Sequence, residues 1–528
     1  MKKVWLLIAI LILAAVLRLY NLSAAPAGLN ADEAAQGYNA YSLLLTGRDE
    51  HGHSWPINFE SFGDFKPAFY GYILIPFIKV FGLTELAVRL PAALAGILAV
   101  LVIYLLVKEL FDEKLGYLSA LLLAISPWHL HFSRGGWEVS LALTLILIGV
   151  WAFLKRSLVL STFALVLSTY TYQTARIIVP LFVMAMVILN YHEVMQEKKK
   201  FMISAIIGLV LLLPLIYSFL FQGAASRIGG VGLLADEGPV NRVNELRGQY
   251  AKPDSLPVKL LHNKVFGYAW AFMENYTDQF RGDFLFITGD PIERNKVPET
   301  GLLYWSDLIF LIIGAVYLIK QSGSKVRLIW VWLVITPIAA ALTFQTPHAL
   351  RALPMVIPLT ILTAAGINSL AKKINLQLLL LLLLLIYGWQ VARYLHEYYV
   401  HYPQTYPAAW EYGFSEAVAY ANANKDRYEH VYVTNKYDQP YILFLFYSHY
   451  PPVKFQFHHQ LTMRDKYNFS TVNTFDKYVF TDTNWDKVSD IHPILIIAAA
   501  EDIPPVGVNV VKTINFPNGQ PEFKIISN

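Results

Sequence analysis

Residues 28–38, Gly-Leu-Asn-Ala-Asp-Glu-Ala-Ala-Gln-Gly-Tyr, follow the first apolar segment of the chain, which ends near Val16. They place two adjacent carboxylates, Asp32 and Glu33, at the edge of an otherwise apolar protein. An ionised side chain is costly in such surroundings unless it has a partner or a task. One interpretation is that this stretch carries chemistry. The alternative is that both acids solvate a surface turn and cap a helix over about 34–45, with Asp32 as its N-cap.

The composition around this stretch is that of a membrane protein. Of the 528 residues 55% are hydrophobic and only 15% are charged, and the mean hydropathy is +0.43. These values place the chain among polytopic membrane proteins rather than soluble enzymes. The absence of cysteine excludes disulfides, a thiol nucleophile and a cysteine metal site. The net charge of +4 is small, and no nucleic-acid partner is expected.

Twelve apolar segments run through the first three quarters of the chain, and the first is interpreted as an uncleaved membrane helix. The other eleven cover about 67–82, 86–107, 115–128, 138–154, 157–170, 175–190, 201–221, 302–320, 327–343, 349–369 and 375–397. The segment 67–82 is short and contains Pro76 and Lys79, which favours a re-entrant or juxtamembrane helix. About eleven transmembrane helices then remain.

The positions of the basic residues fix the predicted orientation. With eleven spans and a cytoplasmic N-terminus, the clusters in the short loops all fall on the cytoplasmic side, as the positive-inside rule requires. These clusters are Lys108 with Lys114, Lys155 with Arg156, Lys198 to Lys200, Lys320 with Lys325 and Arg327, and Lys372 with Lys373. The same parity places the first loop 21–85, the long loop 222–301 and the region 398–528 outside the cell.

The sequence therefore predicts two domains. Residues 1–397 form a polytopic α-helical membrane domain, and residues 398–528 form an extracytoplasmic α/β domain. In the second domain we expect a helix at 408–424, a strand at 430–434 and a helix near 441–447. Further strands are expected at 453–457, 494–498 and 508–514, without a phosphate-binding glycine loop. The aromatic content of 266–286 predicts that the long outer loop is an ordered cover.

The outer loops collect the polar residues. Beside Asp32 and Glu33 they hold Glu138 and a set of basic side chains, namely Lys66, Arg134, Arg176, His348 and Arg351. This combination suits transfer of a sugar from a lipid-linked phosphate. One carboxylate would take the proton from an acceptor hydroxyl, and the cations would bind the phosphate and stabilise it as it leaves.

Simpler interpretations stay open for each residue. Arg134, Arg176 and Arg351 lie near span ends and could extend to lipid headgroups, and His348 could be structural. We interpret Lys79 and Arg89 as anchors, with Glu85 paired to one of them. Metal binding is a further alternative, because His51, His53, His129 and His131 could ligate a divalent cation. Their spacing fits no strong template, so no metal site and no cofactor are predicted.

Several of these pieces resemble a known family. The Asp32-Glu33 pair, Lys66-Pro67 opening a segment that ends in Phe81-Gly82, and Ala-Val-Arg-Leu-Pro-Ala-Ala-Leu-Ala-Gly-Ile-Leu-Ala-Val over 87–100 resemble the GT-C membrane glycosyltransferases. Within that class they resemble the protein O-mannosyltransferases and the lipid A aminoarabinose transferases. Ser-Pro-Trp-His-Leu-His-Phe-Ser-Arg over 126–134 and Arg-Ala-Leu-Pro over 351–354 also fit.

The resemblance implies an inverting transfer from a polyprenyl-monophosphate sugar at the outer face of the cell membrane. It implies that Asp32 is the base, with Glu33 beside it, that Glu138 is the second-loop acid, and that Lys66 lies near the donor phosphate. The acceptor would be a lipid, glycan or protein of the envelope. Phe65 departs from the pattern, because the aminoarabinose branch has an acid there, and the mannosyltransferases have His-Pro-Pro over the positions of 65–67.

Two other functions compete with this hypothesis. A transporter or flippase of a lipid-linked sugar would need ionisable residues near the bilayer midplane and internal repeats, and the sequence shows neither. A receptor domain on an inert anchor would need one helix rather than eleven.

Overall fold

The computed structural model describes residues 2–62, 64–221, 230–465, 470–483, 493–504 and 507–527. Every one of the twelve predicted apolar segments is helical in it. The helices are α1 (Lys2–Leu19), α3 (Phe69–Phe81), α4 (Glu85–Leu110), α5 (Glu113–Ile125), α7 (Glu138–Leu154), α8 (Leu158–Thr171), α9 (Ala175–Leu189), α11 (Lys198–Phe221), α17 (Trp305–Ile319), α18 (Ser324–Ala341), α19 (Val356–Leu370) and α20 (Leu376–His396). The segment predicted at 115–128 is divided at Ser126, because Pro127 begins a new helix, α6 (Pro127–Phe132).

Several of these helices have the properties of membrane spans. Within the described residues, five are long and apolar enough to cross a membrane, and six more are apolar but shorter. The chain is accordingly a multi-pass membrane protein. The number of spans, the re-entrant path of α3 and the side of the membrane that each loop faces stay predictions from the sequence.

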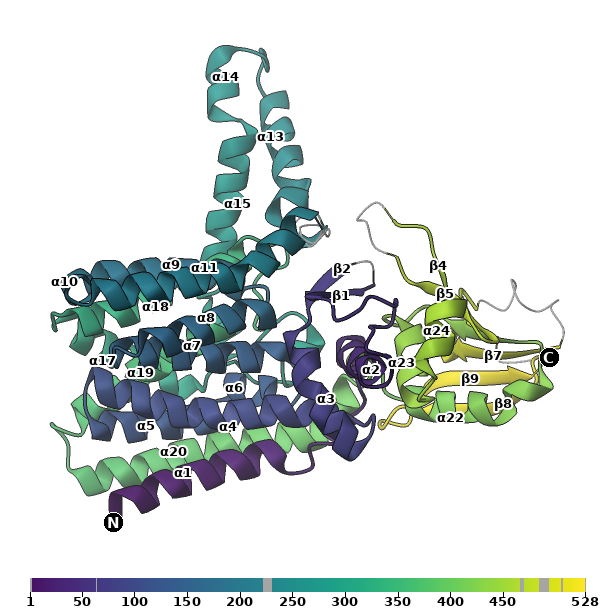
Figure 1. The fold of residues 1–528 in the computed structure, drawn as a ribbon, viewed down its shortest axis with the longest axis horizontal. Coiled ribbons are helices and arrows are strands. Elements are labelled where there is room, and N and C mark those ends of the chain that lie inside the picture. Colours follow the sequence, from purple (N-terminus) through teal and green to yellow (C-terminus); the bar gives the residue numbers. More distant parts are fainter. Residues whose placement is uncertain are drawn as a thin grey trace. The chain divides into compact units, whose positions relative to one another are not determined.

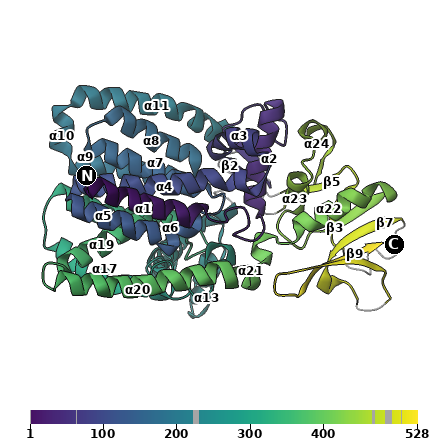
Figure 2. The same cartoon turned by 90° about the horizontal axis from the view of Figure 1, so that it is seen from below.

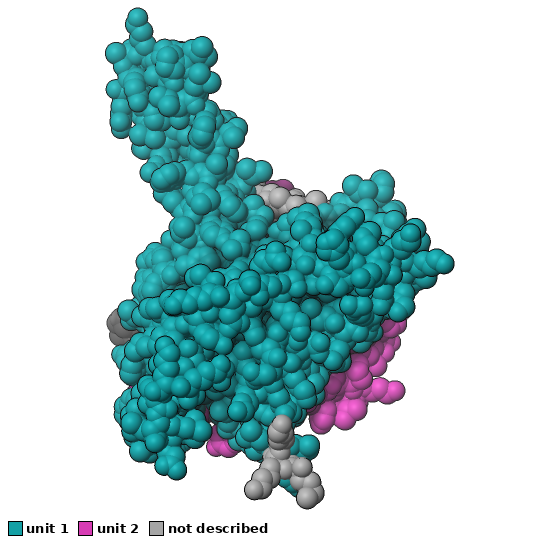
Figure 3. All heavy atoms as spheres, turned by 90° about the vertical axis from the view of Figure 1, so that its left-hand side faces the viewer, with its two compact units in different colours: residues 1–17, 95–132, 139–392 teal, residues 18–94, 133–138, 393–528 magenta. Residues whose placement is uncertain are grey.

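The chain divides into two compact units, coloured separately in Figure 3. Unit 1 contains residues 1–17, 95–132 and 139–392, and unit 2 contains residues 18–94, 133–138 and 393–528. The predicted domain boundary at 397 is near one of these divisions. However, unit 2 also includes the first outer loop and a short piece of the second.

Unit 1 is a bundle of apolar helices in which small residues permit close packing. A Cβ atom added at Gly314 of α17 would be 1.9 Å from the carbonyl oxygen of Leu362 in α19. The reciprocal position, Gly366 of α19, faces the carbonyl oxygen of Phe310 at 2.0 Å. Glycine at both positions therefore lets these two backbones touch, as small residues do between membrane helices.

The long outer loop of unit 1 is helical where the structure describes it. It contains η1 (Leu233–Ala235), α13 (Gly238–Gly248), α14 (Leu256–Leu261), α15 (Lys264–Asp278), α16 (Gly282–Phe286) and η2 (Glu293–Asn295). Residues 222–229 of the predicted loop are outside the described residues. The order expected for 266–286 is confirmed.

Unit 2 is organised around α2 (Ala31–Thr46), which carries the Asp-Glu pair. It packs against α3, and the two helices lie side by side in Figures 1 and 2. A two-stranded antiparallel hairpin, β1 (Asn58–Ser61) and β2 (Asp64–Pro67), precedes α3. Phe59 of β1 packs with Leu43 and Ala68 in a small core. The first outer loop is thus a packed element rather than a flexible linker.

The C-terminal part of unit 2 is a sheet of seven strands in the order β4-β5-β6-β3-β7-β9-β8. The strands are β3 (His430–Thr434), β4 (Gln460–Leu461), β5 (Val472–Phe475), β6 (Tyr478–Thr481), β7 (Ile494–Ala499), β8 (Val510–Asn515) and β9 (Pro521–Ser527). The central strand β3 pairs in parallel with β6 and β7, and the outer pairs are antiparallel. The same region contains the helices α22 (Phe414–Asn424), α23 (Pro440–Tyr447) and α24 (Pro452–His458).

The predicted α/β class of this region is confirmed, but some of its elements differ. The strand expected at 453–457 is the helix α24, because Pro452 provides a helix start that the alternating Val-Lys-Phe-Gln-Phe pattern conceals. The helix expected at 408–424 begins at Phe414, since Gly413 has φ +85° and interrupts it. Strands β4, β5, β6 and β9 were not predicted.

Candidate active site

Helix α2 begins at Ala31, one residue before Asp32. Its N-cap is Asn30, whose side-chain oxygen accepts a hydrogen bond from the backbone N–H of Glu33 at 3.1 Å. Glu33 Oε2 in turn accepts from the Asn30 N–H at 3.3 Å, which completes a capping box. The sequence interpretation of Asp32 as N-cap of a helix starting near 34 is therefore wrong. The cap is Asn30, and both acids lie in the first turn, where the helix dipole favours negative charge.

Glu33 is a fully buried carboxylate with several donors around it. Arg89 of α4 approaches it with two nitrogens, Nε to Oε1 at 2.9 Å and Nη2 to Oε2 at 3.1 Å. The backbone N–H of Gly136 donates to Oε1 at 2.6 Å. Both side chains of the pair have zero exposure. Glu33 thus holds the start of α2 to α4 and to the second outer loop.

Arg89 also binds backbone groups of the first outer loop, which its sequence position did not reveal. Its Nη1 also donates to the carbonyl oxygens of Leu22 at 3.2 Å and Pro26 at 2.9 Å. The interpretation of Arg89 as a lipid anchor is wrong, because the side chain is buried and bonded to Glu33 and to the first outer loop.

Asp32 has different surroundings from its neighbour. Its side chain is 33% exposed and forms a short ion pair with Lys66 Nζ, whose side chain is 14% exposed. Lys66 belongs to β2 and pairs across the hairpin with Phe59. Its ammonium group lies 4.3 Å from the centroid of the Phe62 ring. The hairpin therefore places the Lys66 ammonium group beside the partly exposed carboxylate of Asp32.

The remaining candidates of unit 2 differ in access. Glu138 is half-buried as the first residue of α7, and it acts electrostatically on the Tyr70 hydroxyl together with Glu33. Arg134 is only 1% exposed. Its Nη2 donates to the carbonyl oxygens of Tyr20 at 2.8 Å and Ala25 at 3.1 Å. In this structure Arg134 supports the first outer loop, and its role as a phosphate ligand stays a prediction.

Three predicted cations belong to unit 1. Arg176 donates through Nε to the carbonyl oxygen of Thr169 at 3.1 Å and lies over the Phe219 ring. Arg351 donates through Nη1 to Thr343 Oγ1 at 2.7 Å. His348 Nδ1 is 3.8 Å from Asp290 Oδ2. The part of all three in phosphate binding also stays a prediction.

Asp290 is a buried acid whose importance the sequence did not reveal. Its carboxylate accepts hydrogen bonds from the backbone N–H groups of Ala349 and Ile292, and from Asn295. Burial raises the pKa of Asp290 to about 6, although these hydrogen bonds act in the opposite direction. Asp290 therefore joins the end of the long outer loop to the segment that carries His348.

A second unpredicted acid, Glu50, lies in unit 2. Asn39 of α2 donates to its Oε1 at 3.2 Å, and the backbone N–H of Glu50 donates to Asn39 Oδ1 at 2.9 Å. Burial raises the pKa of Glu50 to about 8. Gln36 and Asn39 lie three residues apart on α2 and are both buried. This helical spacing of two polar residues was the available signal that α2 has a buried polar face.

The histidines and acids do not assemble into a metal centre in the part of the chain that the structure describes. No group of three or more such residues there is placed to hold a metal ion. His51 and His53 are near each other, with ring centroids 6.5 Å apart, and His53 pairs with Asp49 at 3.2 Å. The prediction that the protein uses no cofactor stays a prediction.

Comparison with known proteins supports the resemblance noted in the sequence. The profile of the family described as dolichyl-phosphate-mannose-protein mannosyltransferase matches residues 65–217. No curated protein sequence matches the chain. The solved structure of ArnT from Cupriavidus metallidurans in the apo state aligns over 99% of this chain and 97% of that one, with a TM-score of 0.53 at 12% identity. The chain resembles the GT-C membrane glycosyltransferases.

Two further structures extend this likeness of fold. ArnT bound to undecaprenyl phosphate aligns over the same shares of both chains, with a TM-score of 0.52 at 11% identity. The Archaeoglobus fulgidus oligosaccharyltransferase tethered with an acceptor peptide has a TM-score of 0.50 at 13% identity. That alignment covers 85% of this chain and 63% of the oligosaccharyltransferase. At these identities the likeness is one of fold, and the chemistry must be argued from the residues.

Proposed function

We propose that this GT-C protein is an inverting glycosyltransferase that moves a sugar from a polyprenyl-monophosphate donor to an envelope acceptor. The observation that carries the proposal is the contrast between two neighbouring acids of α2. Glu33 is buried with Arg89, whereas Asp32 is a third exposed and pairs with Lys66. A partly exposed carboxylate can meet the hydroxyl of a substrate, whereas a carboxylate with zero exposure cannot.

In the proposed reaction the oxygen of an acceptor hydroxyl attacks the anomeric carbon of the donor. The new carbon–oxygen bond forms as the bond from that carbon to the phosphate oxygen breaks. The hydroxyl proton passes to the carboxylate of Asp32. The bonding electrons leave with the polyprenyl phosphate, whose charge Lys66 stabilises once the phosphate has displaced Asp32 from it. A single displacement of this kind inverts the configuration at the anomeric carbon.

The remaining parts of the proposal rest on sequence. The family resemblance and the membrane helices support a lipid-linked hexose or pentose as donor, and the undecaprenyl phosphate bound by the related ArnT structure fits such a lipid. The distribution of basic residues supports an active site and a C-terminal domain on the outer face. Arg134, Arg176, His348 and Arg351 are retained as proposed donor-phosphate ligands, and Glu138 as an additional acid near the reaction.

The decisive experiment measures transfer of radiolabelled sugar from a panel of synthetic polyprenyl-phosphate sugars to envelope extract. We expect transfer by the purified wild-type protein and a loss of about 10²- to 10⁴-fold in Asp32→Asn, the usual range for removal of a general base. Asp476→Asn is the matched control, because it removes an exposed carboxylate that pairs only with the surface residue Lys425 at 2.7 Å among the described contacts.

Two outcomes would contradict the proposal. Full activity of Asp32→Asn would exclude Asp32 as the base and direct attention to Glu138. No transfer from any donor, together with movement of labelled lipid across vesicles that contain the protein, would show a flippase instead.

A further inference from the structure

The hairpin formed by α13, α14 and α15 has an unusual direction within unit 1. Figure 1 shows α13 and α15 standing across the direction of the apolar helices α9 and α11, at one end of those helices. Helices such as α11 define the direction in which the bundle crosses a bilayer, because α11 has the length and hydropathy of a span. The hairpin consequently runs along the membrane plane, near one membrane surface.

The hairpin is a built structure rather than a loose loop. A Cβ atom at Gly267 of α15 would be 2.9 Å from Val243 and 3.1 Å from the Pro239 carbonyl oxygen, so α13 and α15 touch there. The base of α15 is tied to α18 and its end. Asn275 donates to the carbonyl oxygen of Thr343 at 2.9 Å, and the Tyr276 hydroxyl donates to that of Val334 at 2.9 Å.

The two sides of the hairpin differ in chemistry. On α13 the exposed side chains are polar, namely Asn241, Arg242, Asn244 and Glu245. On α14 and α15 they are mostly large and apolar, with exposed fractions between 53% and 78%, and comprise Leu256, Leu260, Leu261, Val265, Phe266, Trp270 and Met273. Apolar side chains gathered in this way mark an interaction surface rather than ordinary surface composition.

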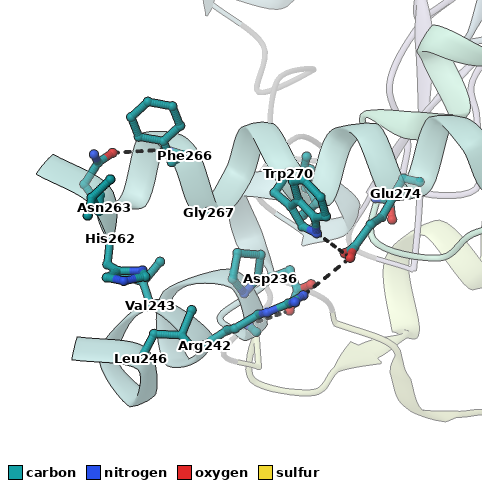
Figure 4. Close-up of a pocket in the computed structure, with 16 residues that line it drawn as sticks. Asp236, Arg242, Val243, Leu246, His262, Asn263, Phe266, Gly267, Trp270 and Glu274 are labelled. Atoms are coloured by element: carbon teal, nitrogen blue, oxygen red, sulfur yellow. Dashed lines mark hydrogen bonds and ion pairs between the residues drawn. The ribbon is translucent and has the colours of Figure 1, made fainter. Parts of the chain in front are cut away.

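Polar groups line the boundary between the two sides. A pocket of about 490 Å³ lies between α13 and α15. Figure 4 shows Arg242, Glu274 and Trp270 in contact at its edge. The indole N–H of Trp270 donates to Glu274 Oε1, which also accepts from Arg242 Nη1 at 3.4 Å. Trp270 therefore combines an exposed apolar ring with a satisfied polar edge, which is the arrangement of an interfacial tryptophan.

We propose that this hairpin is a membrane-interface anchor, with its α14–α15 side in the headgroup and upper acyl region of the leaflet and its α13 side in water. Three features support lipid as the partner of the α14–α15 side. They are the direction of the hairpin, the chemical difference between its two sides, and its charged residues. Lys252 and Lys264 are exposed around the tip, near Leu260 and Leu261, whereas Lys259 is exposed but paired with Asp254 at 3.0 Å. Basic residues flanking apolar ones are typical of segments that bind anionic lipid surfaces.

The test uses the full chain, which has no native cysteine. Single cysteines are introduced by Val265→Cys and Met273→Cys on the apolar side and by Asn244→Cys on the polar side, and each is labelled with a nitroxide. The labelled proteins are reconstituted into vesicles of phosphatidylcholine and phosphatidylglycerol. Collision rates with oxygen, which concentrates in lipid, and with a water-soluble nickel chelate then report the depth of each label.

We expect the labels at 265 and 273 to collide mainly with oxygen, at about 5–10 Å below the headgroups, and the label at 244 to collide mainly with nickel. Equal exposure of both sides to nickel would overturn the proposal. Protection at 273 that disappears when the protein is diluted in lipid would also overturn it, because the cover would then be a second copy of the chain. Each variant is accepted only if its elution and thermal unfolding match those of the unsubstituted protein.

Discussion

Asp32 and Glu33 are consecutive residues of one helix, yet their surroundings are opposite. Glu33 has zero exposure and contacts a guanidinium and two backbone N–H groups. Asp32 keeps a third of its side-chain surface exposed and meets one ammonium group. Successive side chains of a helix point about 100° apart, since a turn contains 3.6 residues. Two consecutive residues thus differ in role, because Glu33 stabilises the fold and Asp32 is exposed enough to accept a proton.

The comparison teaches how the acid that we propose as the base is kept in place. The buried pair Glu33–Arg89 fixes the first turn of α2 against α4 and the first outer loop, so Asp32 is held on a rigid backbone. Reactive groups are positioned more accurately by such supported elements than by free loops. Glu33 then stabilises the fold, and Asp32 carries the proposed chemistry. Measurements of stability and of activity can therefore distinguish the two roles.

The largest expected effect on folding comes from breaking the buried pair. Glu33→Gln leaves the Arg89 guanidinium buried without its counter-charge, and loss of one partner of a buried pair typically costs about 3–5 kcal/mol. We expect a large fall in the thermal unfolding temperature of the detergent-purified protein, or loss of folded protein on size exclusion. Arg89→Met should behave in the same way, since it leaves the Glu33 carboxylate without the same counter-charge.

The double variant Glu33→Gln with Arg89→Met tests whether the two effects share one cause. If they do, the double variant is less destabilised than the sum of the single variants, as expected for contacting residues. Strictly additive losses would show that Glu33 and Arg89 stabilise the protein independently.

Lys66 should have a smaller effect, and on activity rather than on folding. Lys66→Met removes the cation that we place at the donor phosphate, and loss of a hydrogen bond to a charged group costs about 1.5–3 kcal/mol. That corresponds to roughly 10- to 150-fold in kcat/KM. Lys66→Arg should retain part of the activity because it keeps the charge. An unchanged kcat/KM in Lys66→Met would place the phosphate elsewhere.

The sequence predicted most of the helices because long apolar runs between basic turns are strong signals. It also identified Asp32 and Lys66 as candidates, which the structure shows to be paired. It did not predict the partners of Glu33. Arg89 is 56 residues away and Gly136 is 103 residues away, and a contact across such separations leaves no local periodicity in one sequence.

The C-terminal region shows the same limit. Strand β3 was predicted correctly because His-Val-Tyr-Val-Thr is short, β-branched and bounded by polar residues. Helix α24 was predicted as a strand because its residues alternate between apolar and polar, and an alternating pattern of five residues fits either structure. In the structure only Phe455 of its central residues is buried. Pro452 at the first position of the helix, rather than the alternating pattern, decided between them.

Glu50 extends the comparison to a fully buried acid that accepts a hydrogen bond from the neutral amide of Asn39 and lies 3.9 Å from His51 Nε2. Burial raises its pKa to about 8, with the carboxylates of Asp49 and Glu60 acting in the same direction and Asn39 and Lys66 in the opposite one. Because this pKa exceeds the value of 4.5 of an ordinary glutamate, the folded state binds the extra proton between pH 4.5 and 8. The free energy of unfolding contributed by this group is therefore greatest below pH 4.5 and falls as the pH rises through 8.

Glu50→Gln tests this by removing the titration while it keeps the carbonyl acceptor for Asn39. We expect the variant to gain stability relative to the wild type as the pH is raised from 5 to 9. The measurement is the unfolding temperature of both proteins across that range. A constant difference between them would show that Glu50 does not titrate there.

The smallest expected effect is that of Asp32→Asn on stability, and it decides how the activity measurement is interpreted. The Asp32–Lys66 pair is partly exposed and screened by solvent, so its loss should cost about 1 kcal/mol or less. The Asn30 cap and the Glu33 capping box remain intact in this variant. Unfolding temperatures of Asp32→Asn and Glu33→Gln, measured side by side, should therefore differ clearly. If Asp32→Asn unfolded as readily as Glu33→Gln, the two acids would both be structural, and a loss of transfer in Asp32→Asn would no longer identify a base.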